Sequence, residues 1–176
     1  MASCTILAED NLAFLRQARD LVSRLSSSAY ASTGHPVFGS GVGAHLRHVL
    51  DHYANLLAGV EAGRIDYDAR AREQAIESDR AASLARMDEL MAGLRGLAAR
   101  ADAPLRVKMD CGDQSDPAGW WTESSLRREL QFLISHTVHH FALIRLILKI
   151  QGIDAGAQFG VAPSTLRHHA QLACAQ

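Results

Sequence analysis

The chain has 176 residues, of which 48% are hydrophobic and 21% are charged, a balance typical of a globular domain with a substantial core. Its net charge of −1 excludes a protein that is held electrostatically on nucleic acid or on an anionic membrane surface. We therefore expect one domain over residues 1–176, with neither nucleic acid nor membrane as a partner.

The N-terminal stretch and the cysteines indicate the compartment. MASCTILAEDNLAFL has no basic region before an apolar run, so we expect no signal peptide. Cys4, Cys111 and Cys174 are odd in number, far apart and without a CxxC pair, so they form no disulfide framework. These features predict a cytoplasmic protein, because a reducing compartment keeps such thiols free.

Two helices are predicted in the first third of the chain, separated by a glycine-rich loop. Residues 6–28 carry an apolar stripe, and Glu9 and Asp10 favour the positive end of the helix dipole. Residues 42–62 carry a second stripe, which ends at Gly63. The polar residues 64–77 that follow fit either a loop or a short surface helix.

A third helix is predicted over residues 78–100, with Ser78 as its N-cap. Gly93 and Gly96 weaken this helix by about 1 kcal/mol each relative to alanine. Residues 103–122 contain Pro104 and Pro117 and are predicted to be irregular, with a short extended piece over residues 107–111.

The fourth helix, over residues 126–151, is apolar nearly throughout and ends at Gly152. Its length would suit a membrane span, but the charged residues in it argue against one: Arg127, Arg128, Glu129, Arg145 and Lys149. Four such helices predict an all-α four-helix bundle with irregular loops, and a C-terminal tail that packs back on the bundle.

Six of the nine histidines lie in two of these helices, within GAHLRHVLDHY and SHTVHHF. His136 and His140 are four residues apart, the spacing at which two imidazoles on one helix reach one ion. At about 100° per residue, His45, His48 and His52 fall within a wedge of roughly 60° on the other helix, with His45 and His52 nearer the apolar face. One of these three would complete a three-His site with an open position, which is typical of catalytic zinc. A buried histidine network without metal is the alternative.

Three further stretches and single residues have two interpretations each. Cys111 lies in the acidic segment MDCGDQSD and is either a functional thiol or an incidental loop residue. Trp120 and Trp121 either line a pocket or anchor the start of the fourth helix. Arg47 and Arg145 either bind an anionic substrate or form surface salt bridges. His35, His168 and His169 are expected to face solvent.

The segments RHVLDHY and ELQFLISHTVHHFALI, with the closing FGVAPSTLR, resemble the DinB-like (DinB/YfiT-like) superfamily of four-helix bundles. The resemblance covers most of the chain and is weakest in the first and third helices. It implies one divalent transition metal per chain, zinc or nickel, held by His48, His136 and His140. The angular positions on the helix alone favour His45 or His52 over His48, so His52 is kept as the reserve ligand. The resemblance also places the Asp of a His-x-x-Asp element at Asp51, either as an acceptor for a ligand imidazole or as an exposed helical residue.

The same resemblance implies a metal-dependent enzyme of the thiol transferase or hydrolase class. Its substrate would be a small molecule, with a low-molecular-weight thiol as a partner, and the protein would be a homodimer. The alternative is a non-catalytic stress-associated or binding protein whose metal site is vestigial or structural. DNA binding is suggested only by the family name, and the near-neutral charge opposes it.

Overall fold

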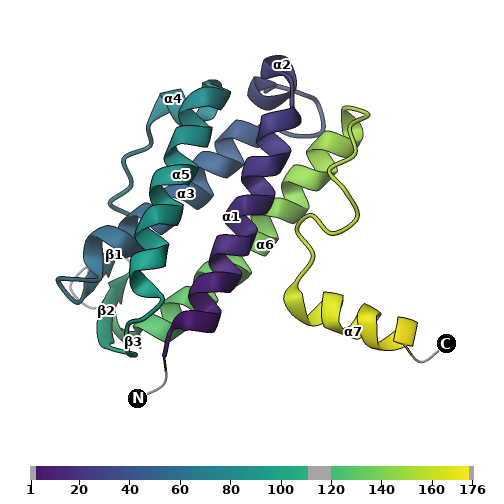
Figure 1. The fold of residues 1–176 in the computed structure, drawn as a ribbon. Coiled ribbons are helices and arrows are strands. Elements are labelled where there is room, and N and C mark those ends of the chain that lie inside the picture. The colour runs from purple at the N-terminus through teal and green to yellow at the C-terminus, as the bar shows by residue number, and fades with distance from the viewer. Residues whose placement is uncertain (1–2, 111–119, 175–176) are drawn as a thin grey trace.

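The structure is a computed structural model that describes residues 3–110 and 120–174. Most of it consists of four long helices: α1 (Thr5–Arg24), α3 (Val42–Gly59), α5 (Arg80–Leu97) and α6 (Leu126–Ile150). Helix α1 packs against α5 and α6, and α3 packs against the same two helices (Figure 1). The prediction of a mainly helical protein is confirmed.

The remaining described elements are short: α2 (Ser27–Ala31), β1 (Arg64–Asp66), α4 (Gln74–Ser78), β2 (Pro104–Lys108), β3 (Trp121–Ser125) and α7 (Pro163–Cys174). The strands form one sheet in the order β1-β2-β3, in which β1 and β2 are parallel and β2 and β3 antiparallel. The sequence predicts an all-α fold with one short extended piece over residues 107–111, which overlaps β2, so the presence of a three-stranded sheet corrects the prediction. Strands of three and five residues are too short to display a persuasive alternation of apolar and polar residues.

Two of the helix boundaries that differ from the predicted ones do so because polar side chains begin new helices. The first helix ends at Arg24, and the Ser26 hydroxyl then accepts the N–H of Ala29 at 3.1 Å to start α2. The third long helix is capped by Asp79, whose carboxylate accepts the N–H of Ala81 at 2.8 Å, and not by Ser78. In both cases a side-chain acceptor satisfies a free N–H of the first turn.

Helix α6 has the limits that the sequence predicts. Ser125 is its N-cap, and Gly152 follows its end with φ of +75°, a conformation that favours glycine. Among the described helices, only α6 is long and apolar enough to cross a membrane, and the core helix of a soluble protein has the same properties. Its buried side chains belong to the same core cluster as those of α1 and α3: Leu130, Leu133, Phe141, Ile144 and Leu148.

A buried polar network links three of the long helices. The Tyr53 hydroxyl of α3 donates to Asn11 Oδ1 of α1 at 2.8 Å and lies 3.1 Å from Thr137 Oγ1 of α6. The Asn11 amide in turn donates to the carbonyl oxygens of Leu7 and Leu130. All three network side chains are fully buried, so each hydrogen bond offsets a desolvation cost.

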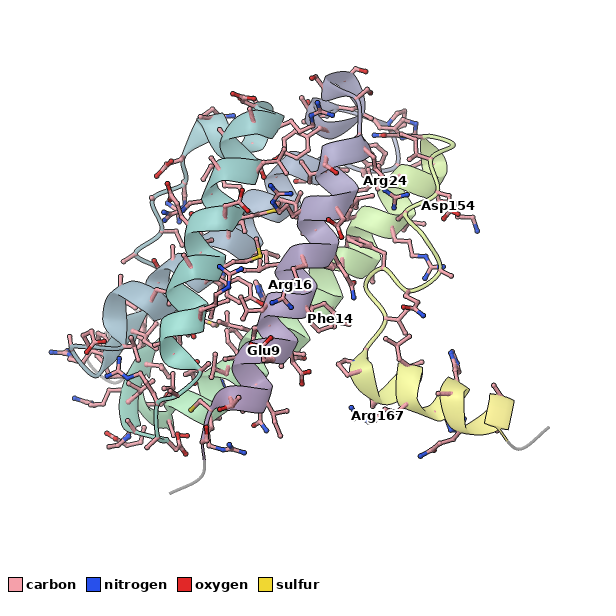
Figure 2. The ribbon with its side chains drawn as sticks, viewed as in Figure 1. Glu9, Phe14, Arg16, Arg24, Asp154 and Arg167 are labelled. Atoms are coloured by element: carbon pink, nitrogen blue, oxygen red, sulfur yellow. The ribbon has the colours of Figure 1, made fainter. Side chains whose placement is uncertain are left out.

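Only part of the C-terminal tail packs back as predicted. Phe159 stacks on Phe141 of α6 with ring centroids 4.5 Å apart, and Arg24 donates to the carbonyl oxygen of Ala155 at 2.7 Å. Figure 2 shows Arg24 at the end of α1, close to the segment that carries Asp154. Helix α7 then extends away from the long helices (Figure 1), which corrects the expectation that the whole tail packs on them.

The packing of α6 predicts that a leucine-to-alanine substitution has different effects on stability at two positions of the helix. Leu148→Ala removes a fully buried side chain and should lower the free energy of unfolding by about 2–5 kcal/mol. Leu146→Ala, two residues away, removes a side chain that is 54% exposed and should change it by less than about 0.5 kcal/mol. Urea unfolding monitored by circular dichroism measures both, and equal effects would contradict the described orientation of α6.

Candidate metal centre

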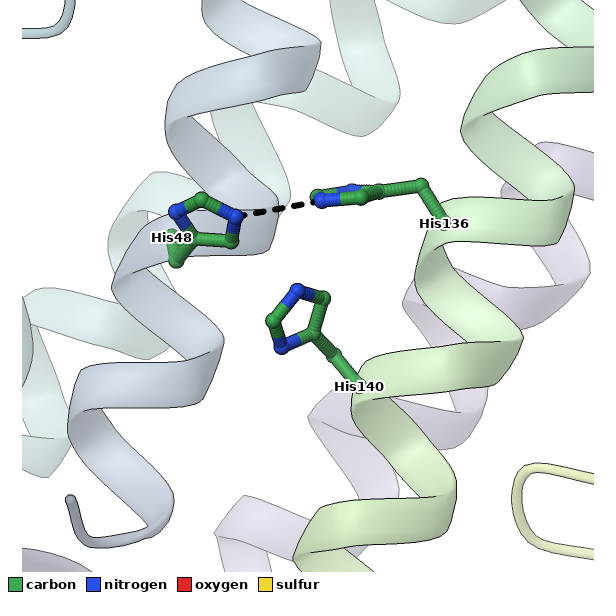
Figure 3. Close-up of side chains that lie close together, drawn as sticks. All are labelled: His48, His136 and His140. Carbon is green, nitrogen blue, oxygen red and sulfur yellow. Dashed lines mark hydrogen bonds between the residues drawn. The ribbon is translucent and has the colours of Figure 1, made fainter. Parts of the chain in front are cut away.

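Three imidazoles meet where α3 lies against α6. His48 comes from α3, and His136 and His140 lie one turn apart on α6 (Figure 3). One ring nitrogen of each lies within 4.8 Å of those of the other two, and the Nε2 atoms of His48 and His136 are 3.1 Å apart. The structure therefore brings together the three residues predicted as ligands.

The size and chemistry of this group fit a zinc or nickel ion. Zinc–nitrogen bonds of about 2.0–2.1 Å place tetrahedral ligand atoms roughly 3.4 Å apart. The 3.1 Å pair is close to that value, and the 4.8 Å limit requires a contraction of about 1.4 Å or less, which rotations of the imidazole side chains can supply. Three imidazoles without a thiolate also leave a fourth coordination position, as in catalytic zinc sites.

Burial keeps these imidazoles neutral. Desolvation, reinforced by the neighbouring imidazoles, lowers the pKa of His48 to about 3, that of His136 to about 2 and that of His140 to about 4. Near pH 7 all three therefore carry a lone pair that can bind a cation.

His45 contacts the group from outside. Its Nδ1 lies 3.1 Å from Nδ1 of His140, whose other ring nitrogen points toward His48 and His136 (Figure 3). A histidine ligand usually donates its second N–H to such an outer acceptor, which fixes the tautomer. The structure thus places His45 as a partner of His140 and not in the three-His group.

His52, the reserve ligand, lies beside the group. Its side chain is only 5% exposed, and its Nδ1–H donates to the carbonyl oxygen of His48 at 2.8 Å. Its ring centroid is 4.1 Å from that of His136, yet none of its nitrogens belongs to the three-nitrogen group. Although His45 and His52 lie nearer the apolar face in the sequence pattern, His48 is the residue of α3 whose nitrogen joins those of His136 and His140.

Asp51 has neither of the two predicted environments. It is buried, with 5% of its surface exposed, and Arg70 rather than Asp51 contacts Nδ1 of His48, at 2.6 Å. Burial raises the pKa of Asp51, and the charges of Arg47 and Arg70 and the backbone N–H of Arg72 oppose that rise. Asp51 therefore interacts with the segment that carries Arg70 and Arg72, and not with one of the three histidines predicted as metal ligands.

Two adjoining cavities open beside the imidazoles. The first, of about 230 Å³, is lined by His48, His52, Tyr67, Asp68, Arg70, Met109, Phe132 and His136. The second, of about 320 Å³, shares Tyr67, Met109 and Phe132 with it and continues to Trp120 and Arg128. Tyr67 is held by its hydroxyl, which donates to the buried carboxylate of Glu129 at 2.8 Å.

The other sequence candidates lie elsewhere or have structural contacts. Arg47 pairs with Glu77 at 3.0 Å, and Arg145 donates to the carbonyl oxygen of Ala157 at 3.4 Å. Trp120 lines the second cavity, whereas Trp121 belongs to β3. His35, His168 and His169 are exposed, as predicted. Cys111 and the side chain of Cys174 lie outside the described residues.

Sequence reasoning missed five residues of the first cavity: Tyr67, Asp68, Arg70, Met109 and Phe132. Phe132 lies one turn before His136 on α6, so helical spacing from His136 and His140 could have located it. Tyr67 and Arg70 follow β1 in the stretch that fitted either loop or helix. No pattern in the sequence indicates that this stretch turns back to α3.

Comparison with known proteins does not show a family for this chain. No family model matches, and no solved structure matches. The chain is 33% identical over 105 residues to FK506-binding protein 5 of Rhizopus delemar. That match covers 59% of this chain but only 27% of the fungal protein. The DinB-like resemblance thus stays a prediction.

The lowered imidazole pKa values predict that the metal-free protein loses stability in mild acid. In the unfolded chain these histidines take up protons near pH 6.5, whereas in the folded chain they stay neutral down to about pH 4 or below. The unfolded state therefore binds more protons as the pH falls from 7 to 5. The free energy of unfolding should decrease by up to about 1.4 kcal/mol per pH unit for each such imidazole.

Urea unfolding in the presence of a chelator, at pH 7, 6 and 5, measures this slope. His168→Gln, a change at an exposed residue of α7, should leave it unaltered. A free energy of unfolding that stays constant or rises over this range would contradict the neutral, buried state of the imidazoles.

Proposed function

We propose that this chain is a DinB-like protein that holds one divalent transition metal, zinc or nickel, through His48, His136 and His140. The observation that supports this most is the approach of one nitrogen from each ring to within 4.8 Å of the others, in a setting that keeps all three rings neutral. The cavity beside these rings supports a metal-dependent enzyme of the thiol transferase or hydrolase class.

The packing of the long helices supports the four-helix bundle that belongs to this proposal. Each of α1, α3, α5 and α6 contacts two of the others in the order α1, α5, α3, α6 and back to α1. A closed arrangement of this kind places side chains from facing helices in one interior, where bundle proteins build their metal sites. The β1-β2-β3 sheet is then an addition at one end of the bundle.

A bound zinc or nickel ion would supply a Lewis acid that polarises a substrate and lowers the pKa of a coordinated water or thiol. The chain's own residues supply the rest of the site. His48, His136 and His140 offer the lone pairs. With the ion on the other ring nitrogen of His140, Nδ1–H of His140 would donate to Nδ1 of His45, which would fix the tautomer of His140. Tyr67 and Phe132 form an apolar wall on the cavity, which favours a small organic substrate.

The proposal includes a cytoplasmic homodimer that acts on a small molecule, with a low-molecular-weight thiol as co-substrate. The alternative is a non-catalytic protein in which the ion only reinforces the fold. The two differ in the role of the ion: an enzyme keeps an open coordination position, whereas a structural site is closed.

Metal content tests the ligand assignment. Protein purified without a His-tag or chelating resin should contain about one zinc or nickel ion per chain by elemental analysis. His140→Ala removes one of the three nitrogens and should lose most of the metal, because two imidazoles hold a divalent ion far less tightly than three. The matched control is His139→Ala, a change one residue earlier at an exposed position, which should retain the ion. Equal metal content in the two variants would remove His140 from the site.

Removal of the metal by a chelator distinguishes a catalytic role of the ion from a structural one. The core cluster draws on all four long helices, so the metal-free protein should stay helical and unfold cooperatively. Its melting temperature should fall only by the amount that ligand linkage predicts. Collapse of the helical circular dichroism signal at room temperature after chelation would favour the structural alternative.

A further inference from the structure

Arg70 is a cation on the wall of the first cavity. Among the described residues Arg70 forms no ion pair, although its charge interacts electrostatically with the buried carboxyl group of Asp51. Its Nε is buried and has no hydrogen-bond partner in the described part of the chain. Asp68 lines the same cavity, and one of its carboxylate oxygens accepts the backbone N–H of Asp110 at 2.5 Å.

The hydrogen bond between Arg70 and His48 determines where the protons of His48 and His136 lie. A guanidinium can only donate, so Nδ1 of His48 accepts from Arg70 Nη1 at 2.6 Å. The proton of the neutral His48 ring is therefore on Nε2, which donates to Nε2 of His136 at 3.1 Å. In the metal-free protein a proton thus occupies the space between His48 and His136.

Metal binding reverses this arrangement at His48. An ion held by Nε2 of His48 requires the ring proton to move to Nδ1, because a neutral imidazole carries only one. Nδ1–H and the guanidinium of Arg70 are both donors, so their contact at 2.6 Å is lost. His136 undergoes no such change, since its proton is already on Nδ1.

We propose that Arg70 binds the anionic group of the substrate, a carboxylate, and that metal binding at His48 frees Arg70 for this role. The inference rests on the proposed function, because it needs an ion at the three-His group. The guanidinium offers paired N–H donors that match the two oxygens of a carboxylate. By thermodynamic linkage, the ion and the carboxylate then increase each other's affinity.

The walls of the two cavities indicate the body of this substrate. Tyr67, Met109 and Phe132 line both cavities and offer aromatic and thioether surface to an apolar group. Trp120, at the far part of the second cavity, has a buried indole N–H without a partner among the described residues. The substrate class that fits is a small carboxylate with an aromatic or aliphatic body.

The test compares a carboxylate with its neutral amide on the whole protein. 3-Phenylpropionate and 3-phenylpropanamide are titrated by calorimetry into zinc-loaded and chelated protein. The variants are Arg70→Gln, Arg70→Lys and, as a matched control, Arg16→Gln on the exposed surface of α1 (Figure 2). Zinc stoichiometry and affinity are measured separately, without the organic ligand, by competition with a chromophoric chelator.

Zinc-loaded wild-type protein should bind the carboxylate about 10-fold or more tightly than the amide, and more tightly than the chelated protein does. Arg70→Gln should lose about 10-fold in carboxylate affinity and, because its carbonyl oxygen can accept the Nδ1–H of His48, should bind zinc at least as tightly as the wild type. The carboxylate affinity of Arg70→Lys should fall between those of Arg70→Gln and the wild type, and that of Arg16→Gln should match the wild type.

Carboxylate affinity that is the same in Arg70→Gln and wild type, while both bind one zinc ion, would overturn the inference and leave the proposed function intact. The same holds if zinc does not change the carboxylate affinity of the wild-type protein. Absence of zinc binding by the wild type would overturn both proposals together.

Discussion

The contact between α3 and α6 is the interaction on which the rest of the structure depends. Five imidazoles, those of His45, His48, His52, His136 and His140, lie in this contact as hydrogen-bonded or ring-stacked neighbours. Polar rings in a helix interface are stable only if they stay neutral and find partners. The network of Tyr53, Asn11 and Thr137 joins the same two helices to α1 and so holds their relative position.

The small sheet extends this interface into a cavity. After α3, the chain forms β1, which is anchored by its pairing with β2, and the backbone then leads to Tyr67 and Arg70. Tyr67 is tied to Glu129 near the start of α6, and Arg70 contacts His48 on α3. Residues from a connecting segment therefore form a wall against the imidazoles, which is a common way for a rigid helical scaffold to acquire specificity.

The sequence was informative wherever a repeating pattern carried the structural signal. The helical period predicted all four long helices, and the i, i+4 spacing of His136 and His140 placed both on one face of α6. It was misleading at Ser78 and near Ser26, because several residues there can cap a helix and only the local backbone decides which one does. Of the sheet, only an extended piece over residues 107–111 was predicted, which overlaps β2. The other two strands were missed because they are short and pair with partners far along the chain.

By itself, the sequence determined the helical class, the neutral charge balance and the two histidine-bearing helices, since these depend on composition and on spacing within one element. Only the tertiary structure decided which histidine of α3 meets His136 and His140. It also decided that His45 and His52 support the group from outside, and that Arg70 faces His48. The reason is physical: a helix fixes the angle between its own side chains, but the rotation and offset of one helix against another are set by the packing of the whole core.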